Sequence, residues 1–158
     1  MTDYLLLITH PSSLIVHRLL LMPFSTRITV RFGETDPAGW VYYPVLFHYC
    51  HVAMEEFFAA RCGTSYEKLM AGERIGFPTV KAQAEFVAPL VYGDEVELEV
   101  FVSRVGRSSA TFEYRLYRAS DRVLCASASL VQVSMDMDAR RAVSIPERYR
   151  QAFAASAE

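Results

Sequence analysis

An acidic loop stands directly in front of a long aromatic segment, running from Glu34 through Gly39 and on to Tyr43. A carboxylate held beside a carbonyl carbon can attack it as a nucleophile or activate water as a base. Backbone amides at the start of a helix lack intrahelical partners and can hold the oxyanion that forms. Asp36 can offer such a carboxylate, and the amides of residues 41–43 can offer such donors. From these residues alone, however, a turn former or a helix cap is the favoured interpretation of Asp36.

Other ionisable side chains in this region have ordinary structural explanations. Glu34 suits a solvated or loop-fixing role, while Glu55 and Glu56 suit the polar face of a helix and stay in reserve as alternative catalytic carboxylates. His48 and His51 lie three residues apart with Glu55 one helical turn further on, but the segment matches no standard ligand motif. We predict no metal site and no bound cofactor.

Composition bounds the class of protein. The 158 residues and 17.9 kDa suit one domain, and a formal net charge of −2 offers no basic surface for a nucleic-acid backbone. We therefore predict no nucleic-acid partner. The cysteines are odd in number and scattered, which favours a reducing cytoplasm over a disulfide framework or a structural zinc site. They are Cys50, Cys62 and Cys125.

The N-terminal segment, residues 1–21, is apolar only in short patches. Polar residues interrupt these patches, so no uncharged run reaches the roughly 18 residues that a membrane span needs. Asp3 precedes the first apolar patch, which does not match the basic start of a secretory signal. We interpret residues 1–21 as a disordered or mispredicted extension, with Met22 as the biological start and a single domain over residues 22–158.

Local patterns predict one strand, then one long helix, then four further strands. Alternating apolar side chains predict a strand from Ser25 to Phe32. A helix is predicted from Pro44 to Arg61, because no glycine or proline interrupts it and Gly63 suits its C-terminal end. A capping-box pattern then predicts a short second helix from Thr64 to Ala71.

Nearly all of the chain from Phe77 to Met135 has the pattern of strands. The clearest segment alternates Glu95, Glu97 and Glu99 with apolar residues that must face inward. An earlier strand places one apolar set on a single face: Val80, Ala82, Ala84 and Phe86. Short turns between the strands allow only antiparallel neighbours, so the sequence predicts an α+β domain in which an antiparallel sheet wraps one helix. Small, weakly polar residues at 125–129 predict that another subunit covers the outer sheet face.

The stretch "FGETDPAGWVYYPVLFHYCHVAMEEFF", with "RIGFPTVKAQAEFVAPLVYGDEVELE" and a final "IPERY" after it, resembles the hotdog-fold acyl-CoA thioesterases, in particular the 4-hydroxybenzoyl-CoA thioesterase type. The likeness runs from Arg27 to Phe153. Its specific part is the aspartate, the Pro-Ala-Gly after it, and an aromatic residue or histidine seven residues beyond the aspartate. The resemblance implies a hotdog fold, a five-stranded antiparallel sheet around a central helix, and a pocket built between subunits.

By the same resemblance, Asp36 matches the catalytic aspartate, and Tyr43 matches the residue whose backbone amide polarises the thioester carbonyl. The predicted substrate-binding residues follow the aspartate or flank a later turn. They are Gly39, Trp40, Val41, Tyr42, Arg104, Arg107 and Ser108. Arg107 is the stronger candidate for the CoA phosphates, with a solvated turn arginine as the alternative. Tyr43 replaces the histidine usual in envelope-associated hotdog thioesterases, which favours an aromatic acyl group.

Two other functions remain as alternatives. A non-catalytic hotdog protein that binds acyl-CoA or assists assembly would not need Asp36 and Tyr43, and both are present. A hotdog dehydratase would bring a catalytic histidine with the central helix, but the surroundings of His48 and His51 do not match that motif. We therefore predict an acyl-CoA thioesterase that acts in the cytoplasm without a cofactor, as a homodimer or homotetramer.

Overall fold

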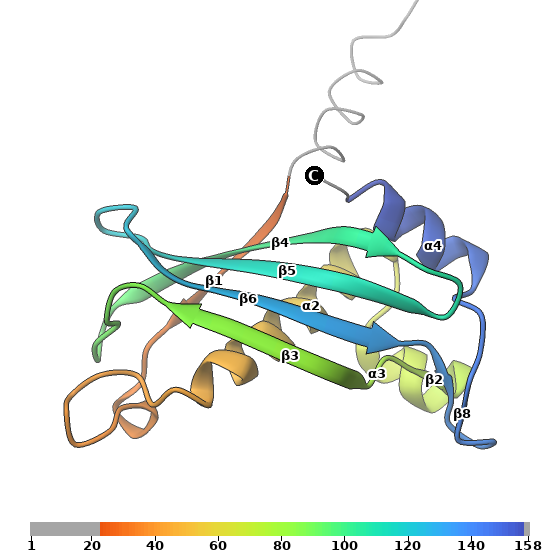
Figure 1. Cartoon of the computed structure of the whole chain (residues 1–158), viewed down its shortest axis with the longest axis horizontal. Helices are drawn as coiled ribbons and strands as arrows, with labels where there is room; N and C mark the ends of the chain where they lie inside the picture. The colour runs from red at the N-terminus through yellow and green to blue at the C-terminus, as the bar shows by residue number, and fades with distance from the viewer. Residues whose placement is uncertain (1–22, 157–158) are drawn as a thin grey trace, which may run out of the picture.

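Five strands form one antiparallel sheet that packs on a long helix (Figure 1). The computed structural model describes residues 23–156. The strands of this sheet are β1 (Phe24–Thr29), β3 (Thr79–Phe86), β4 (Glu95–Val105), β5 (Ser109–Arg118) and β6 (Leu124–Val133). They lie in the order β1-β4-β5-β6-β3, and every neighbouring pair is antiparallel. The long helix is α2 (Val45–Arg61). This arrangement confirms the predicted α+β architecture.

Shorter elements surround this frame. A 3₁₀ turn, η1 (Phe32–Glu34), follows β1, and a short helical segment follows α2 as α3 (Tyr66–Lys68) and the π-helical η2 (Leu69–Glu73). A second, three-stranded sheet has the order β2-β7-β8. Its strands are β2 (Ile75–Gly76), β7 (Met135–Asp136) and β8 (Arg141–Ala142). The last helix is α4 (Glu147–Ala154).

The hydrophobic core lies between α2 and the inner face of the large sheet. On β4, Val96, Leu98 and Val100 are fully buried, as the alternating pattern predicts. The buried positions of α2 cover more than one narrow stripe; they are Leu46, Tyr49, Cys50, Ala53, Met54, Phe57 and Phe58. A helix with buried residues on several sides is enclosed rather than lying on a surface, and this was predicted.

Helix α4 closes one end of this core and was not predicted. Its Tyr149 and Phe153 are fully buried, and Phe153 packs against the rings of Phe58, Phe77 and Phe112. Figure 1 shows α4 at the end of the sheet opposite the loop that leads into α2. The described chain therefore has an aromatic-packed end and a loop end.

Three local predictions are corrected by the structure. The first strand ends at Thr29 rather than Phe32, which lies in η1 and is 78% exposed. Ser65, not Thr64, caps the second helix, because its hydroxyl accepts a hydrogen bond from the Lys68 amide at 3.2 Å. Val80 is largely exposed and lies at an irregularity in the pairing of β3 with β6, between Thr79 and Lys81.

The predicted extension at residues 1–21 and the predicted start at Met22 lie outside the described residues. Within residues 23–156, no helix combines the length and the apolar character that crossing a membrane requires.

Candidate active site

The acidic loop folds as a small hairpin ahead of α2. The Tyr42 amide donates to the Glu34 carbonyl at 2.9 Å, and the Asp36 amide donates to the Trp40 carbonyl at 2.8 Å. The turn between them passes through Gly39, whose φ of +80° is a conformation that residues with a Cβ rarely adopt. The hairpin brings Asp36 back alongside the residues that begin the helix.

The Asp36 carboxylate is fixed through one of its oxygens. Oδ1 accepts a hydrogen bond from the Ala38 amide at 2.8 Å, which is the geometry of an Asx turn. Among the described residues, no hydrogen-bond donor reaches Oδ2. Both the turn former and the reactive carboxylate predicted for Asp36 are therefore compatible with its position, since one oxygen serves each role.

The backbone amides at the start of α2 are not all free, which corrects the prediction for residues 41–43. The Val41 amide donates to the Leu90 carbonyl at 2.9 Å, and the Tyr42 amide donates to Glu34. In the part of the chain that the structure describes, the Tyr43 amide has no hydrogen-bond acceptor, and Pro44 after it has no N–H. Tyr43 therefore carries the amide that is available to an incoming carbonyl oxygen.

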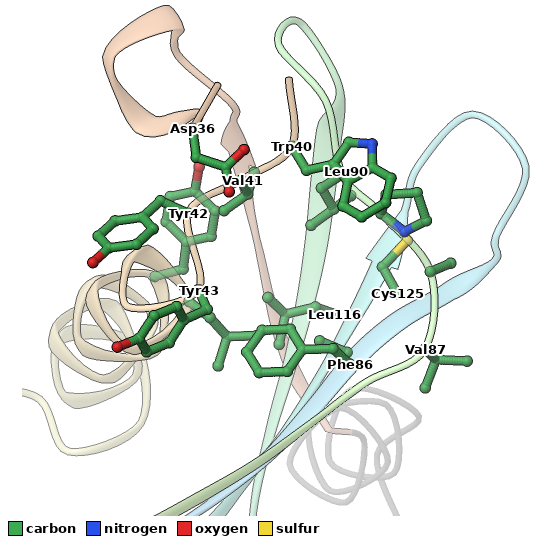
Figure 2. A pocket seen from close by; sticks show the side chains of 15 residues that line it. Asp36, Trp40, Val41, Tyr42, Tyr43, Phe86, Val87, Leu90, Leu116 and Cys125 are labelled. Carbon is green, nitrogen blue, oxygen red and sulfur yellow. The ribbon is translucent and has the colours of Figure 1, made fainter. Parts of the chain in front are cut away.

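A cavity of about 490 Å³ opens between this hairpin, the start of α2 and the sheet. Asp36, Trp40, Val41, Tyr42 and Tyr43 all line it, so the structure brings these predicted residues together. Figure 2 shows Asp36, Tyr42 and Tyr43 on one side of the cavity. The opposite side holds Leu90, Val87 and Cys125 (Figure 2).

The far wall of the cavity was not predicted. It comes from the segment at residues 86–90 and from Leu116, Cys125 and Ala126 of two strands. These strand residues have the same apolar pattern as ordinary core residues, so the sequence carries no separate signal for them. The wall is mainly aromatic and aliphatic, which suits an apolar ligand group.

The remaining predicted residues are not at this cavity. Gly39 shapes the hairpin turn, and the cavity lining does not include Arg104, Arg107 or Ser108. Arg104 lies in β4 and the other two in the β4–β5 turn, at the end of the sheet opposite the hairpin (Figure 1). The Arg107 carbonyl accepts hydrogen bonds from Ile145 and Arg150, each at 2.9 Å.

Tyr49 of α2, which was not predicted as part of the site, holds the hairpin in place. The Tyr49 hydroxyl, on α2, donates to the Glu34 carboxylate at 2.7 Å and lines the cavity. Burial, and then the hydrogen bond to Glu34, raise the pKa of Tyr49 well above its usual value. Glu34 is therefore the loop-fixing residue that the sequence favoured.

The alternative catalytic residues considered from the sequence lie away from the cavity. His48 and His51 are exposed and absent from the cavity lining, and His51 pairs with Glu55 at 3.1 Å. Glu56 accepts a hydrogen bond from the Thr26 hydroxyl on β1. Nothing at the cavity therefore uses the histidine of a dehydratase or a carboxylate from the middle of α2.

An antiparallel sheet wrapped around one helix, with a cavity where the helix begins, is the arrangement of the hotdog fold. Comparison with known families gives the same class. The family model described as the thioesterase-like superfamily matches residues 30–153. The chain belongs to this superfamily.

Individual relatives agree with this family. A 1,4-dihydroxy-2-naphthoyl-CoA hydrolase of Synechococcus elongatus is 31% identical over 120 residues, 75% of this chain and 86% of the relative. A solved gentisyl-coenzyme A thioesterase is 29% identical, with a TM-score of 0.73, over 83% of this chain and 99% of that chain. A solved 1,4-dihydroxy-2-naphthoyl-CoA thioesterase from Synechocystis shares the fold, at 23% identity and a TM-score of 0.76, over 83% of this chain and 95% of that chain. The predicted hotdog fold and thioester hydrolase class are confirmed.

Proposed function

We propose that this thioesterase hydrolyses an acyl-CoA to a free acid and CoA, with Asp36 as nucleophile or general base and the Tyr43 amide as oxyanion donor. One observation carries the proposal. Within the described residues, a carboxylate oxygen and a backbone N–H without hydrogen-bond partners belong to residues that line one cavity. A thioester carbonyl bound there would meet an attacking group and a donor together.

Two routes use this pair of groups. In the first, Asp36 Oδ2 adds to the carbonyl carbon, the C–S bond breaks, CoA leaves as the thiolate, and water cleaves the anhydride and restores the carboxylate. In the second, Asp36 takes a proton from water, the water oxygen adds to the carbonyl carbon, and that proton leaves with the CoA sulfur. In both, the Tyr43 amide stabilises negative charge on the carbonyl oxygen.

The acyl group that best fits the cavity is aromatic. Trp40, Tyr42, Tyr43 and Phe86 supply ring faces and edges around a space of about 490 Å³. Aromatic rings pack at centroid separations of roughly 4.5–7 Å without the rotamer entropy that a long flexible chain loses. Support also comes from the relatives, whose names specify dihydroxynaphthoyl-CoA and gentisyl-CoA as substrates.

The CoA phosphates need cations, and none of the described residues that line this cavity is a lysine or an arginine. We propose that Arg107, with Arg104 and Ser108 beside it, meets the CoA phosphates from a second copy of the chain. The support is that these residues and the cavity lie at opposite ends of one chain's sheet, so one chain alone does not bring them together. We place the reaction in the cytoplasm, which fits three free cysteines.

The test is an assay of the purified full chain against benzoyl-, phenylacetyl-, hexanoyl- and palmitoyl-CoA, with the released thiol detected. We expect hydrolysis, with kcat/KM higher for an aromatic thioester than for palmitoyl-CoA. A higher kcat/KM for palmitoyl-CoA than for both aromatic thioesters would refute the aryl assignment and leave thioester hydrolysis standing. Binding of acyl-CoA without thiol release would instead support a non-catalytic binding protein.

A further inference from the structure

Glu34 and Tyr49 join the two parts of the catalytic pair. We propose that they are positioning residues for the reaction: their hydrogen bond sets the placement of the Asp36 carboxylate relative to the Tyr43 amide. This inference rests on the proposed function, because it concerns the efficiency of the same step. Neither residue needs to touch the substrate for this role.

The first support is the number of bonds that Glu34 makes on both sides of the hairpin. Its Oε2 accepts from the Tyr49 hydroxyl and from the Arg31 amide, each at 2.7 Å. Its carbonyl accepts from the Tyr42 amide at 2.9 Å. Asp36 follows Glu34 by two residues, and Tyr43 follows Tyr42 directly. One residue therefore connects the segment carrying the carboxylate with the segment carrying the amide.

The second support is the rigidity of the anchor. Tyr49 is 1% exposed and lies on α2, the helix that Tyr43 leads into. The loop residues, in contrast, are partly or largely exposed, and the hydrogen bonds of Asp36 are to Ala38, Gly39 and Trp40 of the same loop. A hydrogen bond from a buried helix residue restrains the loop residue that accepts it, because core packing holds the donor in place.

The third support is that this bond persists over a wide pH range. Because burial and the Glu34 carboxylate raise the pKa of Tyr49, its hydroxyl keeps its proton well into alkaline solution. The tyrosine therefore stays a donor to Glu34 well into alkaline solution.

The bond between Tyr49 and Glu34 affects the reaction rate through the geometry of the reacting groups. Displacing reacting groups by about 1 Å can cost on the order of a hundredfold in rate. Loss of the Tyr49 bond would leave the hairpin anchored to the Leu90 carbonyl through the Val41 amide, and would leave the Glu34 side chain bonded to the Arg31 amide of its own segment but not to α2. The expected consequence is a lower kcat with little change in KM, because the cavity walls that bind the acyl group stay in place.

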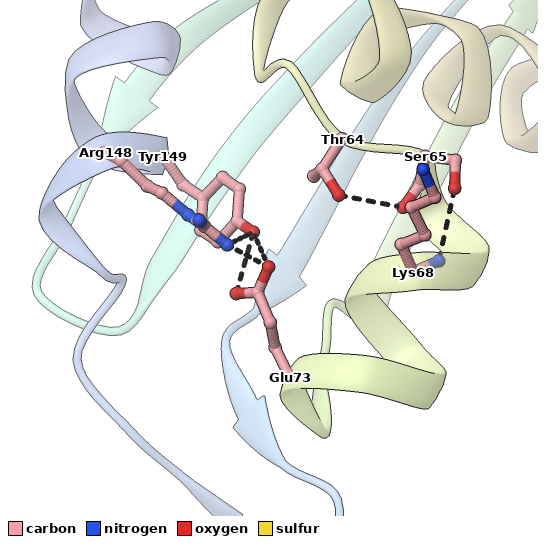
Figure 3. A network of polar contacts seen from close by, with 6 residues as sticks. All are labelled: Thr64, Ser65, Lys68, Glu73, Arg148 and Tyr149. Atoms are coloured by element: carbon pink, nitrogen blue, oxygen red, sulfur yellow. Dashed lines mark hydrogen bonds and ion pairs between the residues drawn. The ribbon is translucent and has the colours of Figure 1, made fainter.

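A matched control exists at the other end of the molecule. Tyr149 on α4 is also fully buried, and its hydroxyl also donates to a glutamate, Glu73, at 2.8 Å (Figure 3). Figure 3 shows Arg148 beside the same pair. Tyr149→Phe and Tyr49→Phe therefore remove the same kind of bond, but only Tyr49→Phe removes it near the cavity.

The experiment measures kcat and KM of both variants on the substrate that the wild type turns over fastest. Tyr49→Phe should lower kcat about tenfold or more, with KM within about twofold of the wild type. Tyr149→Phe should lower the melting temperature but leave kcat within about twofold. Equal kcat for Tyr49→Phe and Tyr149→Phe would overturn the proposal.

Substitutions at Glu34 test the same bond from the acceptor side. Glu34→Ala removes the acceptor, whereas Glu34→Gln keeps an amide oxygen that can accept from Tyr49. We expect Glu34→Ala to lower kcat as Tyr49→Phe does, and Glu34→Gln to recover most of that loss. The double variant Tyr49→Phe/Glu34→Ala should be no slower than the slower single variant. Losses that multiply in the double variant would contradict a shared role.

These experiments also distinguish an error in the proposed function from an error in the positioning role alone. If the wild type hydrolyses no thioester, both proposals fall. If the wild type is active and Asp36→Asn is inactive while Tyr49→Phe and Glu34→Ala keep the full rate, only the positioning role is wrong. Should Tyr49→Phe fail to fold, Glu34→Ala decides the question, since Glu34 is partly exposed and outside the core.

Discussion

In the proposed mechanism, one Asp36 carboxylate oxygen has a structural role and the other a chemical role. The Ala38 amide holds Oδ1, so the carboxylate cannot rotate freely, and Oδ2 is left for a carbonyl carbon or a water molecule. The Tyr43 amide has no acceptor among the described residues. Each group would be a weak signal alone, because Asx turns and helix starts are common. Their meeting at one cavity is what gives them a chemical use.

The first prediction concerns this carboxylate. Asp36→Asn keeps an oxygen that can accept from the Ala38 amide, so the fold should persist. The amide side chain is a poor nucleophile and a poor base, and turnover should fall at least about a hundredfold. The measurement is kcat with the preferred acyl-CoA, alongside the melting temperature. Asp138→Asn, which changes an exposed carboxylate bound to Arg74, is the control and should keep the wild-type rate.

A second prediction concerns the hairpin turn. Gly39 has φ of +80°, and an L-residue in the left-handed region costs about 1–2 kcal/mol, so Gly39→Ala should shift the turn. Because Asp36 lies at the other side of this turn, kcat should fall more than stability alone explains. Gly72→Ala is the control, since its added Cβ meets nothing within 4 Å and Gly72 has no positive φ. An unchanged kcat for Gly39→Ala would separate the turn from the chemistry.

The sequence predicted Asp36 and Tyr43 but also assigned free amides to Val41 and Tyr42. Their acceptors are the Leu90 carbonyl, which is distant in sequence, and the Glu34 carbonyl across the hairpin. Neither pairing can be read from a local pattern, because it depends on how the hairpin folds back against the chain. The type of residue was predictable, and the hydrogen-bond partner was not.

Strands in which apolar and polar side chains alternate strictly were predicted well. β4 has buried valine and leucine between glutamates, so only one face could be inward. The end of β1 and the cap of α3 were less predictable, because Thr64 and Ser65 are both good capping residues. Helix α4 was missed since its short apolar set, Tyr149 and Phe153, resembles a terminal tail until Phe58 and Phe77 cover it.

The third prediction concerns the docking of α4. Burial, and then the hydrogen bond to Glu73, raise the pKa of Tyr149 to about 12 from an ordinary 10.0. The protonated phenol is therefore favoured in the folded state, so its contribution to stability is full below pH 10 and is lost as the pH rises towards 12. Tyr149→Phe should flatten part of this alkaline decline in the free energy of unfolding, measured by urea titration from pH 8 upward.

The control for this prediction is Tyr92→Phe, which changes an exposed tyrosine in the turn before β4. It should keep the wild-type decline. At neutral pH, Tyr149→Phe should also cost about 1.5–3 kcal/mol, the usual net value of a hydrogen bond to a charged group. An alkaline decline identical in the wild type and Tyr149→Phe would show that Tyr149 does not take part in it.

Within a single chain, the predicted CoA-binding arginines and the cavity lie at opposite ends of the sheet. Arg107 lies in the β4–β5 turn, where its side chain contacts Ser144 at 3.2 Å and its carbonyl holds the segment that leads to α4. A linear sequence gives no distance between two ends of a sheet, so this separation was not predictable. The separation itself argues for a second chain at the site.

The last prediction is therefore the assembly. Among the described residues β3 pairs along one edge only, and the exposed fractions of its Val80 and Phe86, and of Val87 directly after it, are 62%, 57% and 63%. An apolar edge strand is prone to pair with another strand, and a second copy would cover it. We expect light scattering at micromolar concentration to give at least twice 17.9 kDa. Val80→Lys should shift the protein towards the monomer and lower kcat/KM, whereas Val123→Lys, at an exposed valine outside β3, should change neither. A wild type that scatters as a fully active monomer would contradict this assembly and would leave Arg104 and Arg107 without the proposed role in binding CoA.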